Sequence, residues 1–561
     1  MTAPAERIIP TPDSPTVATY TISSEGSQLG PEVNVLSIVV DREINRVPTA
    51  TLIIRDGVPG GQTFPVSDSG VFDPGNRIEI SLGYRASNVP VFSGMVTGQR
   101  IKVREQRSVL LVTVKDPTYQ LTITRRSRYF TDQTDSDAWE SILSEAGFRT
   151  DGEATAAVVP ELTQYRSTDW DFIISRVEAN GLVLLATGDN EVTIGEPAVG
   201  RSGVLKLEFR ANLLSFDAAT DLRNQFGDAA ATAWSPADGE AITETATASD
   251  GVEGTDDHYH GGSPEAPELT AWATALGRRS QLARVIATAE YRGSEAAKVG
   301  DTVELSGLGN RFNGLAYVSG LRHELADGRW RSIAQLGIDP EWFTERVAVS
   351  APPAGGLLPA VCGLQVATVL RVHDDPAGEE RILVSTPAFS PEGEGNWARL
   401  ATAVGGANVG SSYRPAVNDE VVVGFLDDDP RHPVILAALH GSRSPAPLPP
   451  TEENDRSGYL SRGENKLIFD DTERSVVIES TDGDRLHLLG KDQRIELTDQ
   501  TGNSIILSSS GIEISSKKDL TLSANGKVEI NGMSVAAKGQ SAGKFESGGN
   551  LTLRGALVQI N

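Results

Sequence analysis

Arg494-Ile-Glu-Leu-Thr, Asn503-Ser-Ile-Ile-Leu and Gly511-Ile-Glu-Ile-Ser are three units of a repeat that runs from Leu467 to the end of the chain. Each unit alternates apolar and polar residues, carries two aliphatic side chains on one face, and turns at a glycine, asparagine or aspartate. The first apolar residues of six units lie 9, 10, 7, 8 and 8 residues apart, at Leu486, Ile495, Ile505, Ile512, Leu520 and Val528. The pattern predicts a ladder of very short β-strands.

These units are too small to fold alone. Two core residues cannot enclose a hydrophobic core, so the units must stack on one another. Three chains winding together would close a triangular core and remove exposed strand edges. About ten layers at the usual strand spacing would give a rod on the order of 50 Å long. We therefore predict an intertwined trimeric β-helix over residues 465–561. The alternative is a single-chain β-solenoid, which usually needs rungs of about 20 residues or more.

Composition limits the class of protein. A chain of 561 residues predicts three or four domains, and Gly 56, Pro 30 and 6% aromatic residues predict more β-structure than helix. The net charge of −26 excludes a general affinity for nucleic-acid phosphates or anionic lipid. Cys362 is the one cysteine, which excludes an intrachain disulfide and any multi-cysteine metal site. We interpret it as a small core residue.

Targeting signals are missing from the sequence pattern. The apolar run that begins at Gly181 falls well short of the roughly 20 residues of a membrane helix. The start, Met1-Thr-Ala-Pro-Ala-Glu, has neither a basic n-region nor an apolar h-region. We therefore expect synthesis in a cytoplasm without a signal peptide.

The N-terminal part, residues 1–345, consists mainly of short alternating runs that predict strands. Helical periodicity is found over about 136–146, 169–180 and 268–284. Residues 221–268 hold eleven acids and one base, a net charge of −10, with few side chains able to fill a core. We interpret this stretch as an exposed insertion or mobile loop. A docking surface for a partner is the functional alternative.

Two proline-rich linkers, residues 346–361 and 442–464, divide the rest of the chain. They enclose residues 362–441, where about five alternating segments suit a small closed barrel.

This barrel region resembles the spike proteins of contractile injection systems, which include VgrG of type VI secretion and related phage-tail and extracellular spikes. The resemblance rests on Val369-Leu-Arg-Val-His-Asp-Asp-Pro-Ala-Gly, Trp397-Ala-Arg, Pro415-Ala-Val-Asn-Asp-Glu-Val-Val-Val-Gly-Phe and Asp428-Asp-Pro-Arg-His-Pro. Asn418 departs from the glycine that is common in the family, although a turn with positive φ tolerates asparagine. The resemblance implies an OB-fold collar. Its motif residues are Asp375, Pro376, Trp397, Arg399, Asp419, Glu420, Phe425 and Arg431.

Both ends of the chain extend this resemblance. Gln164-Tyr-Arg-Ser-Thr-Asp-Trp-Asp-Phe and Lys298-Val-Gly-Asp-Thr-Val are similar to segments of the family's hub, which implies tail-hub β-barrel domains: two barrel-like subdomains with short helices. The ending at Gly549-Asn-Leu-Thr-Leu is similar to spikes whose blunt tip carries a PAAR-type protein. That resemblance implies a binding platform for such a tip protein. We assign it to Val558, Gln559, Ile560 and Asn561.

The resemblance implies a structural protein: the central spike and hub of a contractile injection particle. It would form a homotrimer, dock on a hexameric inner tube protein and on baseplate proteins, and carry a PAAR-type tip protein with possible effector cargo. Sheath contraction would drive it through the target envelope, with transient contact to the target membrane. It would be found in an assembled particle, either cytoplasmic or released. The alternatives are a trimeric phage tailspike depolymerase and a passive adhesin.

Enzyme and metal signals have simpler explanations in this sequence. Gly539-Gln-Ser-Ala-Gly has the form of a nucleophile elbow but lies in a glycine-rich turn with no helix predicted after it. His258 and His260 could share a metal only with a third ligand from elsewhere. Asp427-Asp-Asp-Pro could hold calcium, but an inter-strand loop of solvated acids is the simpler interpretation. We expect no catalytic residue, no cofactor and no metal.

Overall fold

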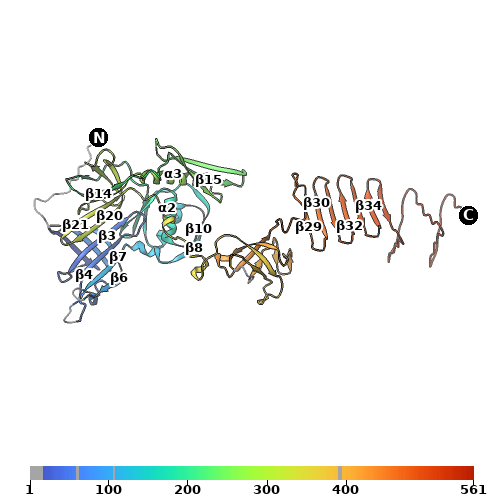
Figure 1. The fold of residues 1–561 in the computed structure, drawn as a ribbon, viewed down its shortest axis with the longest axis horizontal. Helices are drawn as coiled ribbons and strands as arrows, with labels where there is room; N and C mark the ends of the chain where they lie inside the picture. The colour runs from blue at the N-terminus through green and yellow to red at the C-terminus, as the bar shows by residue number, and fades with distance from the viewer. Residues whose placement is uncertain (1–16, 58–61, 105–107, 250, 390–394, 561) are drawn as a thin grey trace. The chain divides into compact units, whose positions relative to one another are not determined.

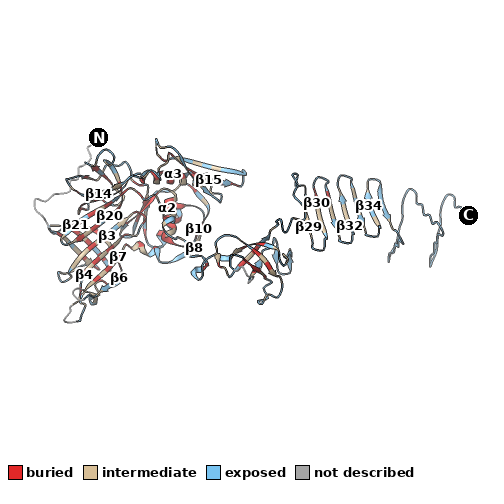
Figure 2. Ribbon diagram, viewed as in Figure 1, coloured by how far each residue is buried: buried red, intermediate tan, exposed pale blue. Residues whose placement is uncertain are grey.

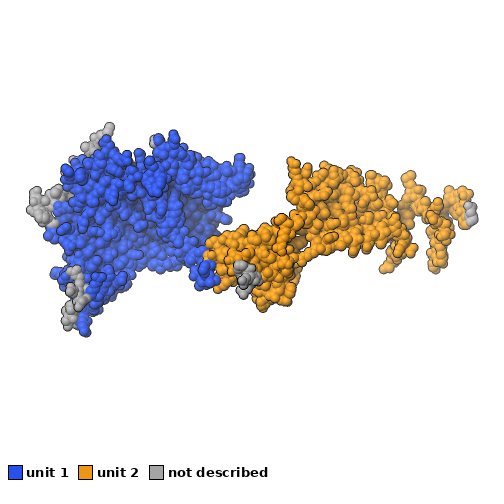
Figure 3. Space-filling model, viewed as in Figure 1, with its two compact units in different colours: residues 1–359 blue, residues 360–561 orange. Residues whose placement is uncertain are grey.

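The structure is a computed structural model that describes residues 17–57, 62–104, 108–249, 251–389 and 395–560. The chain divides into two compact units, residues 1–359 and residues 360–561, which Figure 3 colours separately. Both units consist mainly of β-strands. The mainly-β fold class predicted from the sequence is therefore confirmed.

One large sheet dominates the first unit (Figure 1). Its strands are β1 (Ala18–Ser24), β2 (Ser27–Gln28), β3 (Val35–Glu43), β4 (Thr49–Arg55), β5 (Arg77–Tyr84), β6 (Ser87–Lys102), β7 (Val109–Lys115), β13 (Leu205–Glu208), β14 (Leu213–Ala219), β18 (Ile286–Arg292), β19 (Thr302–Ser306), β20 (Gly314–Ala326) and β21 (Arg329–Leu336). The order is β14-β18-β21-β20-β3-β4-β7-β6-β5-β1-β2, with β19 attached to β20 and β13 attached to β19.

The sheet joins two regions that are far apart in the sequence. Strand β20 pairs antiparallel with β3, from Gly320 opposite Glu43 to Ala326 opposite Ser37. The two barrel-like subdomains expected from the sequence are thus halves of one continuous sheet. Each half keeps its own hydrophobic core, one around Leu52 and Ile80 and one around Val303.

A helical layer accompanies smaller sheets in the first unit. Its helices are α1 (Asp135–Glu145), α2 (Asp169–Ala179) and α4 (Phe343–Arg346), with strands β8 (Arg125–Thr134), β9 (Arg149–Gly152), β10 (Val158–Thr168), β11 (Val183–Gly188) and β12 (Glu191–Gly195). Thr134 and Thr168 cap α1 and α2, because their hydroxyls accept hydrogen bonds from backbone N–H groups in the first turn. Short 3-10 helices occur at Ser67–Ser69, Pro117–Thr122, Pro353–Gly356 and Leu426–Asp428. Within the described ranges, no helix is long and apolar enough to cross a membrane.

The acidic segment 221–268 is not the loop expected from its composition. It forms a three-stranded sheet of β15 (Asp228–Ser235), β16 (Glu240–Thr247) and β17 (Thr255–His260), packed on α3 (Ala266–Leu282). Ala231 and Ala233 are buried against Leu269 and Ala273 of the helix. Small side chains allow a sheet and a helix to approach closely, so a core forms without large apolar residues. The expectation of a loop was wrong because it counted large side chains only.

A closed five-stranded barrel begins the second unit, as the motifs predicted. It consists of β22 (Gln365–Arg371), β23 (Ile382–Ser385), β24 (Asn396–Leu400), β27 (Glu420–Phe425) and β28 (Pro433–Ala438), with a small hairpin of β25 (Gly405–Gly406) and β26 (Val409–Gly410). Val369, Ile382, Val421 and Val423 are fully buried in its core. Cys362 is exposed and lies before the first strand, so its assignment to the core was wrong.

The tail folds as an antiparallel meander. Its strands are β29 (Arg456–Leu460), β30 (Lys466–Asp470), β31 (Ser475–Glu479), β32 (Arg485–Leu489), β33 (Arg494–Thr498), β34 (Ser504–Ser508) and β35 (Gly511–Ser515). Each strand pairs with its neighbour in the same chain, so this stretch differs from the predicted intertwining. Residues 516–560 are exposed and form no strand, although Leu520-Thr-Leu-Ser and Lys527-Val-Glu-Ile-Asn have strand patterns. A single chain gives these segments no neighbouring strand to pair with.

Candidate functional site: the barrel and the tail sheet

The first barrel motif is a turn held by one carboxylate. Asp375 accepts hydrogen bonds from the backbone N–H groups of Ala377, Glu379 and Arg381. The guanidinium of Arg381 also lies 2.7 Å from an Asp375 oxygen. This hydrogen bond from Arg381 holds the pKa of Asp375 well below its ordinary value. Pro376 follows and restricts the turn, so the motif fixes the connection between β22 and β23.

Two further motif segments are also turns. Asp429 accepts a hydrogen bond from the backbone N–H of Arg431 and pairs with its guanidinium at 2.6 Å. This contact lowers the pKa of Asp429 to about 2. Asn418 has φ of 71°, and Asp419 accepts a hydrogen bond of 2.6 Å from the N–H of Ala416. Asn418 therefore adopts a left-handed turn conformation, which asparagine tolerates better than most residues.

The remaining motif residues belong to strands of the barrel. Trp397 lies opposite Leu383 in the β23–β24 pair, and the Arg371 guanidinium stacks 5.0 Å from its ring centroid. Phe425 packs against the barrel core, whereas Glu420 and Arg399 are exposed. The eight motif residues are thus spread over turns and strands of the barrel, where they support its shape.

One face of the tail sheet is an apolar surface, which we call the apolar tail face. Strand register places two columns of aliphatic or aromatic residues side by side on it. The first column is Leu467, Ile478, Leu486, Leu497, Ile505 and Ile514; the second is Phe469, Val476, Leu488, Ile495, Leu507 and Ile512. In one chain these residues remain partly exposed: Ile505 is 38% exposed, Leu497 is 48% exposed and Ile512, on the last strand, is 72% exposed. Figure 2 shows the tail strands mostly tan and pale blue.

The opposite face of the tail sheet carries charged residues together with Ile468, Val477 and Ile506, and we call it the charged face. Lys466 lies directly opposite Glu479, and its ammonium is 3.0 Å from the Glu479 carboxylate. Arg494 pairs with Glu496 at 2.6 Å, and His487 lies opposite Glu496 in the next strand. A sheet with one charged face and one apolar face is suited to expose the first and bury the second.

The residues assigned to a tip platform lie in the strandless end of the chain. Val558, Gln559 and Ile560 are exposed, and Ile560 is 85% exposed. Asn561 lies outside the described residues. The single chain therefore presents these residues without a defined platform.

The sequence motifs weighed as enzyme or metal sites are placed as follows. Gly539-Gln-Ser-Ala-Gly lies in an exposed stretch, and no helix follows it up to residue 560. His258 pairs with Asp256 at 2.9 Å, and both His258 and His260 pack edge-on against Trp272. Across the described ranges, no group of three or more histidine, cysteine or acidic side chains is placed to hold a metal ion.

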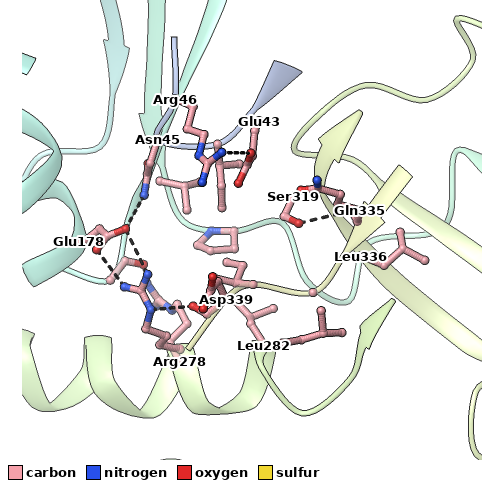
Figure 4. A pocket seen from close by; sticks show the side chains of 18 of the residues that line it. Glu43, Asn45, Arg46, Glu178, Arg278, Leu282, Ser319, Gln335, Leu336 and Asp339 are labelled. Carbon is pink, nitrogen blue, oxygen red and sulfur yellow. Dashed lines mark hydrogen bonds and ion pairs between the residues drawn. The ribbon is translucent and has the colours of Figure 1, made fainter. Parts of the chain in front are cut away.

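A buried carboxylate in the first unit was missed by the sequence interpretation. Figure 4 shows the cavity beside it, about 470 Å³ in volume, between α2, α3 and the sheet. Glu178 accepts hydrogen bonds from Asn45 at 2.9 Å, from Arg279 at 3.0 Å and from the backbone N–H of Phe343 at 2.7 Å. It thereby ties α2 to the turn after β3, to α3 and to α4. An acid beside Val177 on the apolar side of a helix is the signal that could have identified it.

Two family models match the chain, one in each compact unit. The family model described as the Alg8 N-terminal domain matches residues 14–327, more than half of the chain. The chain belongs to this family. A second model, described as the type VI secretion system and phage-baseplate injector OB domain, matches residues 365–440. That match covers all five strands of the barrel, so the OB fold predicted for this region is confirmed.

The curated relatives of this chain include type VI secretion system spike proteins. The chain is 29% identical over 167 residues to spike protein VgrG3 of Vibrio cholerae, covering 27% of this chain and 15% of the relative. It is 32% identical over 112 residues to spike protein VgrG1b of Pseudomonas aeruginosa, covering 19% of this chain and 15% of the relative. The chain thus spans about 15% of the length of each of these relatives. Over these segments the chain is similar to VgrG spike proteins, as its motifs indicated.

Solved structures similar to this chain include tail and secretion proteins. A tail protein from Neisseria meningitidis is 13% identical and covers 58% of this chain and 98% of its own, with a TM-score of 0.46. The E. coli c3393 protein, a component of the type VI secretion system, is 16% identical and covers 74% and 99%, with a TM-score of 0.38.

Proposed function

We propose that this chain is the structural central spike and hub of a contractile injection particle, and that it acts as a homotrimer. One observation carries the proposal: an injector OB domain is followed in the same unit by a sheet with a continuous uncovered apolar face. The motifs of an injector OB domain and an apolar surface suited to burial between chains therefore occur in one chain.

The apolar tail face supports a trimer of this chain. Monomeric soluble proteins rarely leave large contiguous apolar surfaces exposed. Three sheets with their charged faces outward and their apolar faces inward would close a triangular prism. Each aliphatic side chain buried in this way contributes on the order of 1 kcal/mol, because it is already half-covered in the single chain. Twelve such residues per chain make this the main source of association energy.

Residues 516–560 fit the same assembly. Segments such as Leu551-Thr-Leu-Arg alternate like strands but have no partner strand among the described residues. Two neighbouring copies would supply the missing strands, and backbone N–H and C=O groups would be paired across chains. The last layer would then present Val558, Gln559, Ile560 and Asn561 as a platform for a PAAR-type tip protein.

The Alg8-type first unit would provide the hub. In this proposal it docks on a hexameric inner tube protein and on baseplate proteins, while the tail meets the target envelope and touches its membrane when the sheath contracts. Effector cargo would travel with the tip. The chain acts mechanically, without a catalytic step, and works within an assembled particle.

The solution mass of the purified full chain tests this proposal. Light scattering should give about 179 kDa, three times the 59.6 kDa of one chain. The trimer should persist on dilution to nanomolar concentration, because so much apolar surface is buried between chains. A monomer at micromolar concentration would refute the trimer and the rigid spike with it. A chain shortened to residues 1–464 is the matched control and should be monomeric at the same concentration.

A further inference from the structure

Strand β16 presents a long, regular and unpaired edge. In the sheet order β16-β15-β17, β16 pairs with β15 alone. The pairing runs from Glu240 opposite Ser235 to Thr247 opposite Asp228 without a shift in register. Alternate residues of an antiparallel strand direct their backbone N–H and C=O groups to opposite sides. The outer side of β16 therefore carries a row of backbone donors and acceptors with no strand beside it.

Several other edge strands of the first unit are interrupted or short, whereas β17, at the other edge of the same sheet, is regular over six residues. Strand β10 contains Pro160 and a register shift after Gln164. Strand β14 has a register shift after Leu213, and β2 has two residues. Prolines, bulges and short length are the usual devices that prevent a sheet edge from accepting another strand. Strand β16 has neither a proline nor a bulge over its eight residues.

The side chains of β16 define the charge of this edge. Glu240, Ile242 and Glu244 alternate along one face of the strand, and Ile242 packs against the core under α3. Neither glutamate forms an ion pair within the described part of the chain. The surrounding segment 221–268 has a net charge of −10, so no nearby excess of basic residues balances them.

We propose that the free edge of β16 binds an extended, basic segment of a partner protein by strand addition. In an added strand, the residues opposite Glu240, Ile242 and Glu244 are alternate residues of the partner. The complementary pattern is therefore a basic residue, any residue, an apolar residue, any residue, and a second basic residue. Main-chain hydrogen bonds supply affinity, and the two charge pairs supply the choice of partner.

Charge also disfavours self-association at this edge. A second copy of β16 would bring two more glutamates to the same edge, and like charges opposite one another destabilise strand pairs. The predicted occupant is thus a different protein. The inference concerns the first unit only and holds whether or not the tail forms a trimer.

Peptide binding to the purified full chain tests the proposal. The probe is a fluorescein-labelled peptide, Ser-Thr-Lys-Thr-Val-Thr-Lys-Thr-Ser, and its counterpart has glutamate in place of both lysines. Fluorescence anisotropy at low ionic strength should show saturable binding of the lysine peptide, at least about tenfold tighter than the glutamate peptide. The double variant Glu240→Lys/Glu244→Lys should prefer the glutamate peptide instead.

Two controls separate strand addition from general attraction of charge. The double variant Glu161→Lys/Glu253→Lys changes two exposed acids outside β16 by the same total charge and should keep the preference for the lysine peptide. Lysine peptides with proline at the valine, or at the threonine after it, lose an N–H group on one edge or the other. One of them should bind about tenfold more weakly than the other. No saturable binding, an unchanged preference in Glu240→Lys/Glu244→Lys, or equal binding of both proline peptides would overturn the proposal.

Discussion

The barrel and the tail sheet of the second unit differ in where their apolar side chains go. In the barrel, Ile382 and Val423 are fully buried by neighbours from the same chain. In the tail, the equivalent inward positions of short strands, such as Leu497 and Ile505, remain 48% and 38% exposed. A closed five-stranded sheet encloses its own core, whereas a flat meander of five-residue strands cannot. One region is therefore complete as a single chain, and in the proposed trimer the other is completed by copies of itself.

The largest effect is expected from an acid on the apolar tail face. Ile505 and Ile506 are neighbours on β34, but strand alternation places them on opposite faces of the sheet. In a trimer, Ile505→Asp would bury three carboxylates in one layer at a cost of several kcal/mol each. Light scattering should show the 179 kDa species replaced by single chains.

Ile506→Asp is the matched control for this prediction. It introduces the same charge on the same strand, but on the face that carries Glu496 and Glu513. The trimer should persist, with a small loss of thermal stability from the additional acid. Equal dissociation of both variants would contradict an inward-facing apolar tail face.

Truncating a core side chain of the barrel should lower its stability by the same amount at every protein concentration, because the barrel core lies within one chain. Ile382→Ala removes a fully buried side chain and should cost about 3 kcal/mol of barrel stability. Val366→Ala, at a 47% exposed position on β22, should cost less than about 0.5 kcal/mol. Denaturant unfolding should show the loss at every protein concentration, whereas unfolding of the tail should depend on concentration. A barrel transition that shifted with concentration would remove the distinction between the two regions.

Two histidines extend the comparison to pH. Burial lowers the pKa of His323 from 6.5 to about 4, and its ring lies 2.9 Å from the Ser332 hydroxyl inside the first unit. The unfolded chain binds the proton more readily, so the neutral histidine stabilises the folded state above pH 6.5. This contribution should be lost as pH falls from 6.5 to 4, by about 3 kcal/mol in all.

Unfolding of the first unit measured across this pH window checks the prediction. The variant His323→Gln should flatten the slope between pH 6.5 and 4. His487→Gln, on the charged face of the tail sheet, should leave that slope unchanged, because it lies in the other unit. A slope that survived His323→Gln would assign the pH dependence to other groups.

The sequence determines local features more clearly than tertiary ones. Trp397-Ala-Arg and its neighbouring turns identified the barrel, because turn chemistry and strand alternation are local. The same alternation predicted which tail residues share a face. It did not predict that β29 to β35 pair within one chain while residues 516–560 do not, because strand pairing depends on neighbours beyond each unit.

Two other features were not predicted for the same reason, namely that they depend on contacts with distant segments. Residues 221–268 were interpreted as a loop because alanine, threonine and aspartate are weak indicators of a core, yet α3 covers Ala231 and Ala233 closely. Glu178 was not identified from the sequence, because its partners come from three distant segments. The composition of a short segment does not show which distant helix or strand will pack against that segment.

The smallest effect is expected on the charged face of the tail sheet, and it sharpens the contrast with the apolar face. Lys466 and Glu479 form a directly opposed pair at 3.0 Å, but both side chains remain about a third exposed. Because water and salt screen such pairs, Lys466→Ala should lower tail stability by less than about 1 kcal/mol. The difference should nearly vanish between about 0.05 M and about 1 M salt, as the Debye length shortens. Thermal unfolding at both salt concentrations measures this. A loss as large as that of Ile505→Asp would mean that the charged face, rather than the apolar face, is buried between chains.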